Sequence, residues 1–322
     1  MAQYFGGIDV GGTKILTIIM NEDREIVGRS KTKTPVLASG EELVQLMVGE
    51  LKTALDDAKI KKNLLKSLGA TFPGPVDFET GWVKDAPNLG IQSYPLQQAL
   101  MDALQIPVTL ENDVNAGIYG ELIAGAARGY QHVVGVYPGT GIGGGIIIDG
   151  HLYRGISGGA GEVGHMKVQL EGRLCGCGQR GCLEAMASKT AIAKELVHLA
   201  MTGKAQTILE KAGSDISAIK SKYIRQSIEA GEIHVQNVVE KAAYYLGVGL
   251  ANLVNIFNPQ LIVLGGGLIE KLDKWILPIA QQTMRDNAMP SLVQRVEIKV
   301  AQLEDDSVAL GVAALGKEAA NR

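Results

Sequence analysis

Three cysteines and one histidine gather in the segment 162–184, where they match the ligands of a zinc ion. The cysteines are Cys175, Cys177 and Cys182, and His165 precedes the first of them by ten residues. Three thiolates and one imidazole complete a tetrahedral shell for Zn²⁺, and a shell without an open position is typical of a structural site. The alternative, three unrelated buried thiols, is disfavoured because all three cysteines fall within eight residues.

Glycines and glutamates surround this group of ligands. The glycines beside the cysteines are expected to take positive φ, because the chain must turn sharply around an ion; they are Gly176, Gly178 and Gly181. Glu162 and Glu184 flank the loop at its two ends, and zinc needs neither of them. A carboxylate beside a metal-bound loop is held rigidly, so these two are candidates for binding a polar ligand.

Length and composition restrict the class of protein. With 322 residues, 46% of them apolar, the chain can form two domains with a sizeable core. A net charge of −3 gives no support for a nucleic-acid or membrane-surface partner. The N-terminus lacks the pattern of a signal peptide, and no run of about 18 apolar residues predicts a spanning helix. An odd number of cysteines in one loop argues for a reducing compartment, so we expect a cytoplasmic protein.

The chain opens with a strand over Tyr4–Val10, a glycine-rich turn, a second strand over Ile15–Met20 and a third over 25–34. The spacing of the turn is not that of a Walker A loop, and it leads into a strand. Its backbone N–H groups can still wrap a phosphate, and Asp9 precedes it where a bound Mg²⁺ would lie. A simple β-turn between two strands would also favour two glycines. The candidate nucleotide-binding residues here are Asp9, Gly11, Gly12, Thr13 and Lys14.

A second strand–turn–strand pattern begins at His132 and repeats the first one. A strand over 132–137 leads into a glycine-rich turn, a strand to Ile148, an Asp-Gly turn and a strand to Arg154. The candidate phosphate-binding residues of this turn are Gly139, Thr140 and Gly141. The repeat predicts two related halves facing across a cleft. No acidic residue stands where Asp9 does in the first half, so the halves would do different work.

Asp113 lies between a predicted strand, 107–110, and a predicted helix, 114–126. It is therefore an N-cap, a catalytic carboxylate, or in part both. The helix dipole favours the ionised carboxylate at this position, which leaves it ready to accept a proton. Asn112 beside it offers a donor and an acceptor to a ligand rich in hydroxyl groups. Asn88 occupies another loop, where it serves either a ligand or the turn itself.

The remaining elements alternate between helix and strand. Ser39 and Glu42 form a capping box at the start of a helix over 41–58. Further helices are expected over 96–104, 185–202, 205–212, 217–230, 235–257 and 307–320, and further strands over 65–71, 261–264 and 296–302. The strand at 261–264 is followed by three glycines that open a helix, an arrangement that can receive the phosphates or adenosine of a nucleotide. These glycines are Gly265, Gly266 and Gly267.

Together these segments resemble the ROK family of sugar kinases and related repressors. The motifs that carry the resemblance span nearly the whole chain: 9–14 (DVGGTK), 111–116 (ENDVNA), 139–144 (GTGIGG), 162–165 (EVGH), 175–184 (CGCGQRGCLE) and 264–267 (LGGG). The resemblance implies the actin-like, hexokinase-like fold, an α/β fold whose two domains each have a ribonuclease-H-like core and close on an interdomain cleft. The expected domains are 1–113 with about 303–322, and 114–302 with the zinc loop 165–182.

The resemblance also implies roles for single residues. Asp113 is the catalytic base, and the zinc ligands are His165, Cys175, Cys177 and Cys182. The sugar-binding residues would be Gly74, Asn88, Asn112, Asp113, Glu162, His165 and Glu184. The double role of His165 is physically sound, because a ring with one nitrogen on Zn²⁺ must carry its proton on the other, which then donates to a sugar oxygen.

The activity implied is ATP-dependent phosphorylation of a hexose at its 6-hydroxyl, with glucose as the first choice of substrate and Mg²⁺ and structural Zn²⁺ as cofactors. Asp113 would take the proton of the hydroxyl that attacks the γ-phosphoryl group. The alternatives are a kinase for N-acetylmannosamine, N-acetylglucosamine or fructose, and a sugar-responsive repressor without its DNA-binding domain. The repressor is disfavoured because the first strand begins at about Tyr4. Polyphosphate is an alternative donor, and a homodimer or homotetramer is expected.

Overall fold

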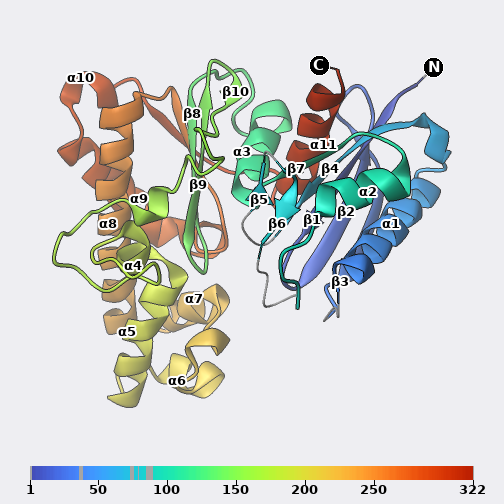
Figure 1. Ribbon diagram of the computed structural model, residues 1–322. Helices are drawn as coiled ribbons and strands as arrows, with labels where there is room; N and C mark the ends of the chain where they lie inside the picture. The colour runs from blue at the N-terminus through green and yellow to red at the C-terminus, as the bar shows by residue number, and fades with distance from the viewer. Residues whose placement is uncertain (1, 36–38, 73–75, 79, 85–89, 322) are drawn as a thin grey trace. The chain divides into compact units, whose positions relative to one another are not determined.

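The structure is a computed structural model that describes residues 2–35, 39–72, 76–78, 80–84 and 90–321. The chain forms two compact units (Figure 1). Unit 1 comprises Met1–Tyr130, Ile146–Ala160 and Gln302–Arg322, and unit 2 comprises Gln131–Gly145 and Gly161–Ala301. The boundary expected between residues 113 and 114 therefore falls inside unit 1, and the segment Ile146–Ala160 also belongs there.

Unit 1 is built on a five-stranded sheet with the order β3-β2-β1-β4-β7. The first three strands form the expected antiparallel meander, and β1, β4 and β7 run parallel. Their bounds are β1 Tyr4–Val10, β2 Lys14–Met20, β3 Ile26–Lys33, β4 Leu65–Thr71 and β7 Val108–Glu111. Most residues of β1 and β4 are buried, so both faces of these central strands are covered.

Helices cover both faces of this sheet. The helices are α1 (Gly40–Asp57), α2 (Leu96–Leu104), α3 (Asp113–Ala124) and α11 (Asp306–Ala320). On β1, the missing side chain of Gly6 points toward Leu51 of α1, while that of Gly7 points toward α11. A Cβ atom at Gly7 would overlap the carbonyl oxygen of Ala309, so glycine allows α11 to lie directly on the strand. The side chain of Ser39 caps α1 by accepting the N–H of Glu42, 3.3 Å away.

Packing between α3 and α11 explains the bounds of unit 1. The two helices are the most extensively packed pair in this unit, and the helix after Asp113 therefore stays with the first sheet. Glu121 of α3 strengthens this join, because its carboxylate accepts the N–H groups of Gln302 and Leu303 at 2.9 Å. A two-stranded ribbon of β5 (Val76–Asp77) and β6 (Trp82–Val83), and the short 3₁₀ helix η1 (Lys62–Leu64), complete the unit.

The second five-stranded sheet has the order β10-β9-β8-β11-β12, with β8, β11 and β12 parallel. Its strands are β8 Val133–Pro138, β9 Ile142–Ile148, β10 His151–Leu152, β11 Leu261–Leu264 and β12 Glu297–Val300. The final strand of the meander was expected to reach Arg154 but ends at Leu152. Both sheets consist of an antiparallel meander followed by two parallel strands, which agrees with the repeat seen in the sequence and with a pair of ribonuclease-H-like cores.

Helices make up most of unit 2. They are α4 (Leu183–Ala187), α5 (Lys189–Met201), α6 (Gln206–Ala212), α7 (Ser221–Glu229), α8 (Ile233–Phe257), α9 (Ile269–Asn287) and α10 (Pro290–Val293), with 3₁₀ helices η3 (Val163–His165) and η4 (Ile216–Ala218). The helix expected over 185–202 is broken at Ser188, whose extended backbone ends α4 and whose side chain caps α5. The helix expected over 217–230 is likewise divided into η4 and α7.

The long helix α8 presents an apolar stripe to the core of unit 2. Val235, Val239, Leu246 and Leu250 are buried in the core of unit 2, where α8 packs on α4, α5 and α9. The helix ends at Asn258, which takes a left-handed backbone conformation just before a proline. Among the described residues, no helix combines the length and the apolarity needed to cross a lipid bilayer.

Candidate active site and metal centre

The parallel strands of unit 1 carry several polar residues to one edge of the sheet. Asp9 is near the end of β1, Thr71 ends β4, and Asn112 and Asp113 follow β7. The carboxyl ends of parallel strands meet at one edge, which is where α/β folds bind ligands. The hydroxyl of Thr71 donates a hydrogen bond to Asp9 Oδ1 over 2.8 Å. We call this group of Asp9, Thr71, Asn112 and Asp113 the acidic corner.

Both carboxylates of the acidic corner have raised pKa values. Burial raises the pKa of Asp9 to about 6; the Thr71 hydrogen bond opposes the rise, and the charge of Asp113 adds to it. The Asp113 side chain is exposed to solvent, but the protein atoms around it partly desolvate the carboxylate and raise its pKa. The hydrogen bond from the N–H of Val114 opposes this rise. Each anion is therefore less stable than in water, and a bound cation or proton would relieve that cost.

Asn112, not Asp113, is the N-cap of α3. The side-chain oxygen of Asn112 accepts the N–H groups of Val114 and Asn115 at 2.9 and 3.1 Å. Asp113 is the first residue of the helix, and its Oδ1 also accepts the N–H of Val114, 2.9 Å away. The prediction that Asp113 could serve as the cap was therefore wrong. The N–H of Val114, at the start of the helix, stabilises the anion and lowers the pKa of Asp113, but desolvation raises the pKa by more.

The turn between β1 and β2 has the tight form expected of a glycine-rich loop. Gly11 donates its N–H to the carbonyl of Lys14 over 2.9 Å, and Thr34 donates its hydroxyl to the carbonyl of Gly11. Gly12 and Thr13 are exposed to solvent. The ammonium of Lys14 is paired with Asp305, which also holds Lys31. An incoming phosphate would therefore have to compete with Asp305 for Lys14.

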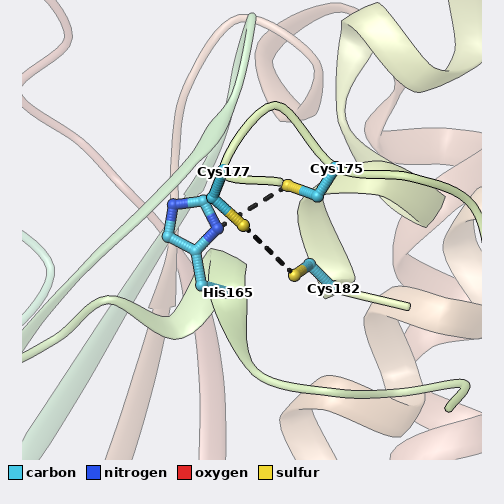
Figure 2. A group of neighbouring side chains, drawn as sticks. All are labelled: His165, Cys175, Cys177 and Cys182. Atoms are coloured by element: carbon cyan, nitrogen blue, oxygen red, sulfur yellow. Dashed lines mark hydrogen bonds between the residues drawn. The ribbon is translucent and has the colours of Figure 1, made fainter. Parts of the chain in front are cut away.

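In unit 2, the four side chains predicted to bind zinc converge on one point (Figure 2). Their ligand atoms all lie within 4.8 Å of one another. Nδ1 of His165 is 3.7 Å from Sγ of Cys175, and Sγ of Cys177 is 3.7 Å from Sγ of Cys182. Ligands about 2.0–2.3 Å from a tetrahedral zinc ion lie about 3.5–3.8 Å apart, so these distances fit the ion.

The electrostatics of this cysteine loop, residues 165–182, also suit a cation. Burial raises the pKa of the Cys175 thiol to about 11, whereas the N–H of Gln179 lowers the pKa of Cys177. Cys175 and Cys182 are both buried, and a buried thiolate needs a nearby positive charge. The ammonium of Lys167 is 3.1 Å from Sγ of Cys182 and supplies part of that charge.

Two of the three glycines in the cysteine loop have the expected backbone conformation. Gly178 and Gly181 have φ values of +84° and +73°, but Gly176 does not have positive φ. A Cβ atom at Gly181 would also overlap the carbonyl oxygen of Gln169, because the loop folds back on itself there. Positive φ and close approach together make glycine necessary at residue 181.

The orientation of His165 is compatible with the double role predicted for it. Its Nδ1 faces the thiols, and its Nε2 lies on the other side of the ring, 3.9 Å from Oε2 of Glu162. The side chain of Glu162 is 72% exposed and free to meet a ligand. Glu184, in the first turn of α4, is more constrained, because its Oε2 accepts the N–H of Ile142 over 3.1 Å. Glu184 thus joins the end of the cysteine loop to the strand β9.

The glycine-rich turn between β8 and β9 rests on the start of α5. Lys189 donates its N–H to the carbonyl of Gly139, and the Thr190 hydroxyl donates to the carbonyl of Thr140 over 2.7 Å. A cavity of about 670 Å³ opens beside this turn. The residues that line it include Thr140, Gly141, Arg173, Glu184, Lys194 and His198.

Gly265, Gly266 and Gly267 do not open a helix directly, because α9 begins only at Ile269. They instead hold the end of β11 against β8, where the N–H of Gly265 donates to the carbonyl of Val136 over 3.1 Å. The N–H of Leu268 donates to the carbonyl of Pro138, next to the turn at residue 139. Two further predicted sugar contacts, Gly74 and Asn88, lie outside the described residues.

Two residues that support the acidic corner, Glu111 and Arg154, were not among the predicted site residues. Thr71 pairs in register with Glu111 across β4 and β7, and Glu111 is completely buried. Arg154 forms an ion pair with that carboxylate, with 2.6 Å between Nε and Oε2. The signal available in the sequence was a polar residue at the end of each predicted buried strand, although Arg154 itself lies in no such position.

Comparison with known proteins places the chain among a large set of relatives. The ROK family pattern matches residues 5–319. The chain is 32% identical to a glucokinase of Halalkalibacterium halodurans, covering 99% of this chain and 96% of that protein. It is also 30% identical to the xylose repressor of Bacillus subtilis, covering 98% of this chain and 77% of the repressor.

Solved structures agree with these relatives. The ROK hexokinase of Thermus thermophilus superposes with a TM-score of 0.86 at 28% identity, covering 99% of each chain. A ROK family glucokinase of Streptomyces griseus, solved in complex with glucose and AMPPNP, superposes with a TM-score of 0.79 at 30% identity, covering 99% of this chain and all of that one.

Proposed function

The chain belongs to the ROK family and has its actin-like, hexokinase-like fold, and we propose that it is a glucokinase that transfers the γ-phosphoryl group of ATP to the 6-hydroxyl of glucose. Relatives named glucokinase match over nearly the full chain. The observation that carries the proposal is the acidic corner, where the carboxylate of Asp113 opens α3 at the same edge of the sheet as Asp9 and Thr71.

In the proposed reaction, Asp113 accepts the proton of the sugar 6-hydroxyl while that oxygen forms a bond to the γ-phosphorus. The bond between the γ-phosphorus and the bridging oxygen breaks, and ADP leaves with the electron pair. A raised pKa suits this task, because a general base works best when its pKa approaches the working pH. The desolvated carboxylate gains more by taking the proton than one in water would.

The sugar is proposed to be held by Asn112, Glu162, His165 and Glu184, with Gly74 and Asn88 as further contacts. The free Nε2 of His165 supports this role, since it carries a proton whenever Nδ1 is bound to a metal. Glu162 offers an exposed carboxylate. Glu184 offers Oε1, which lies 3.5 Å from Sγ of Cys175 and becomes available to a sugar when that thiol is bound to the metal. Catalysis then rests mainly on alignment and on neutralising charge.

ATP is proposed to lie against the glycine-rich turns at residues 11–14 and 139–141, with Gly265–Gly267 near the adenosine. Asp9 is the proposed carboxylate for Mg²⁺, which supplies positive charge to the phosphates when bound. The raised pKa of Asp9 supports this, because a buried carboxylate beside a second one gains from a cation. Thr71 holds Asp9 in one orientation through its hydrogen bond.

Zinc is proposed as a structural ion bound by His165, Cys175, Cys177 and Cys182. It would fix the loop that carries His165 and join it to Glu184, which follows Cys182 by two residues. Three cysteines gathered in one loop are typical of a metal site in a reducing compartment, which supports a cytoplasmic protein.

The decisive experiment is a coupled assay of the purified protein with ATP and Mg²⁺ against glucose, fructose, mannose, N-acetylmannosamine and N-acetylglucosamine. We expect the highest kcat/KM with glucose, and product analysis should place the phosphate on the 6-hydroxyl. Polyphosphate in place of ATP tests the alternative donor. Sugar binding without phosphorylation of any of these substrates would instead favour a sugar-responsive repressor.

A further inference from the structure

Glu111 is a buried carboxylate that the proposed chemistry does not use. It ends β7 directly before Asn112 and Asp113, and its side chain has no exposed surface. Leaving a carboxylate in such a place is costly unless it is paired and hydrogen-bonded. The residues that bond to Glu111 therefore indicate its role.

Glu111 accepts hydrogen bonds from two residues of the segment 112–115 and from Arg154, which lies outside this segment. Oε1 accepts the backbone N–H of Asn112 over 3.0 Å and Nδ2 of Asn115 over 3.1 Å. Oε2 accepts Nε of Arg154 over 2.6 Å. Asn112 in turn caps the N–H groups of Val114 and Asn115. The backbone on both sides of Asp113 is thus fixed through one carboxylate.

Arg154 is the cation that makes this arrangement possible. It follows β10 and accepts the N–H of Ala160 through its carbonyl, which closes the loop between them. Two residues after Ala160, the chain reaches Glu162, one of the proposed sugar ligands. Arg154 therefore connects the segment before Glu162 with the segment that holds Asp113.

We propose that Arg154 is a positioning residue that acts through Glu111 to hold Asn112 and Asp113 in the orientation needed for phosphoryl transfer. The inference rests on the proposed kinase activity and extends it to a residue that touches neither substrate. The contacts of Glu111 are with the backbone N–H of Asn112 and the side chain of Asn115, so the role is one of orientation.

Arg154→Ala is the principal test, measured with glucose and ATP far below the melting temperature. Misplacing a catalytic group by about 1 Å can cost 100-fold, so we expect kcat to fall about 10- to 100-fold. The KM for ATP should stay within about twofold of wild type, and the acid limb of the kcat–pH profile should not move. A purely structural ion pair would instead lower Tm and leave the kcat of the folded enzyme unchanged.

Chemical rescue adds a readout specific to the lost guanidinium. Arg154 lines cavities of about 270 and 450 Å³, so its truncation leaves room for a small cation beside Glu111. Guanidinium at millimolar concentration should restore part of kcat in Arg154→Ala, and equal concentrations of sodium chloride or urea should not. If Arg154→Ala does not fold, Arg154→Lys keeps the charge but not the Nε–H donor, and it should lose several-fold in kcat.

Arg29→Ala is the matched control, because Arg29 pairs with Asp306 elsewhere in unit 1 and should leave kcat unchanged. A wild-type kcat in both Arg154 variants, a loss that guanidinium does not restore, or a shifted acid limb would overturn the inference. If the wild-type protein phosphorylates no sugar, the proposed function itself fails, which is a separate result.

Discussion

The acidic corner and the cysteine loop carry the proposed chemistry in two different ways. The acidic corner lies at the ends of three hydrogen-bonded parallel strands, and the register of those strands determines where its side chains meet. The cysteine loop contains isolated bridges such as that between Lys167 and Cys182, but no strand of the two large sheets. A sheet can hold its residues without a ligand, whereas a loop of this kind depends on its ion.

This difference predicts that the two regions respond to different perturbations. With Mg²⁺ kept in excess, the acidic corner should tolerate a zinc-selective chelator but should respond to pH, because both carboxylates have raised pKa values. The cysteine loop should respond to chelators and to loss of one ligand. Perturbing each region separately therefore tests whether the acidic corner and the cysteine loop respond independently.

The largest effect is expected from Asp113→Asn, which should lower kcat by about 10²–10⁴, the usual contribution of a general base. The fold should survive, and Tm at pH 7 should change by only a few degrees, because the side chain is exposed and asparagine keeps an oxygen that can accept the N–H of Val114. Steady-state kinetics and thermal melting test both parts. Turnover close to that of the wild type would remove Asp113 from the mechanism.

Loss of the metal should act on the cysteine loop and spare the acidic corner. Zinc-selective chelation of the wild type with Mg²⁺ in excess, or Cys182→Ser, should weaken glucose binding about 10- to 100-fold, a cost comparable to disturbing the shell of a metal site. ATP binding should change much less, and added Zn²⁺ should restore the chelated wild type but not the variant. Isothermal titration with each ligand measures this, and equal losses for glucose and ATP would contradict it.

Asp9→Asn should stabilise the protein at neutral pH while lowering its activity. The folded pKa of Asp9 is raised to about 6, so its contribution to stability is present at low pH and is lost as pH rises through 6. A shift of about two units corresponds to at most about 3 kcal/mol, and solvent access reduces it, so we expect a gain of about 1–3 kcal/mol at pH 8. Denaturant unfolding at pH 8 and pH 5 measures the difference.

The gain in Asp9→Asn should shrink toward pH 5, because the wild-type carboxyl becomes protonated there in the folded state. Thr71→Val is a useful companion, since it removes the hydrogen bond to Asp9 but keeps the charge. A stability difference that is independent of pH would show that the charge of Asp9 is not the cause.

The smallest effect is expected from Ser39→Ala, which removes the cap of α1 in unit 1. Loss of such a cap typically costs about 1 kcal/mol, so Tm should fall by a few degrees. The kinetic constants should not change, because α1 contributes no residue to the acidic corner. A fall in kcat at low temperature would show that the acidic corner depends on α1, although no hydrogen bond described here joins the two.

The sequence predicted those parts of the molecule that depend on neighbours in the chain. The helix over Leu96–Leu104 and the strands over Tyr4–Val10 and Leu65–Thr71 were confirmed with the same bounds, because a repeat of apolar residues and its bounding turns are local signals. The convergence of His165 with the cysteines followed from their short spacing and types. The family resemblance extended this to the two repeated sheets, which the structure contains.

Only the tertiary structure decided which distant residues meet. The hydrogen bond from Thr71 to Asp9 joins residues 62 positions apart, and the pair of Glu111 and Arg154 spans 43. Such contacts depend on which strands are neighbours and in what register, and no local pattern encodes that. The choice of Asn112 as cap, the raised pKa values and the placement of α3 with α11 have the same origin, since each is set by packing from outside the segment.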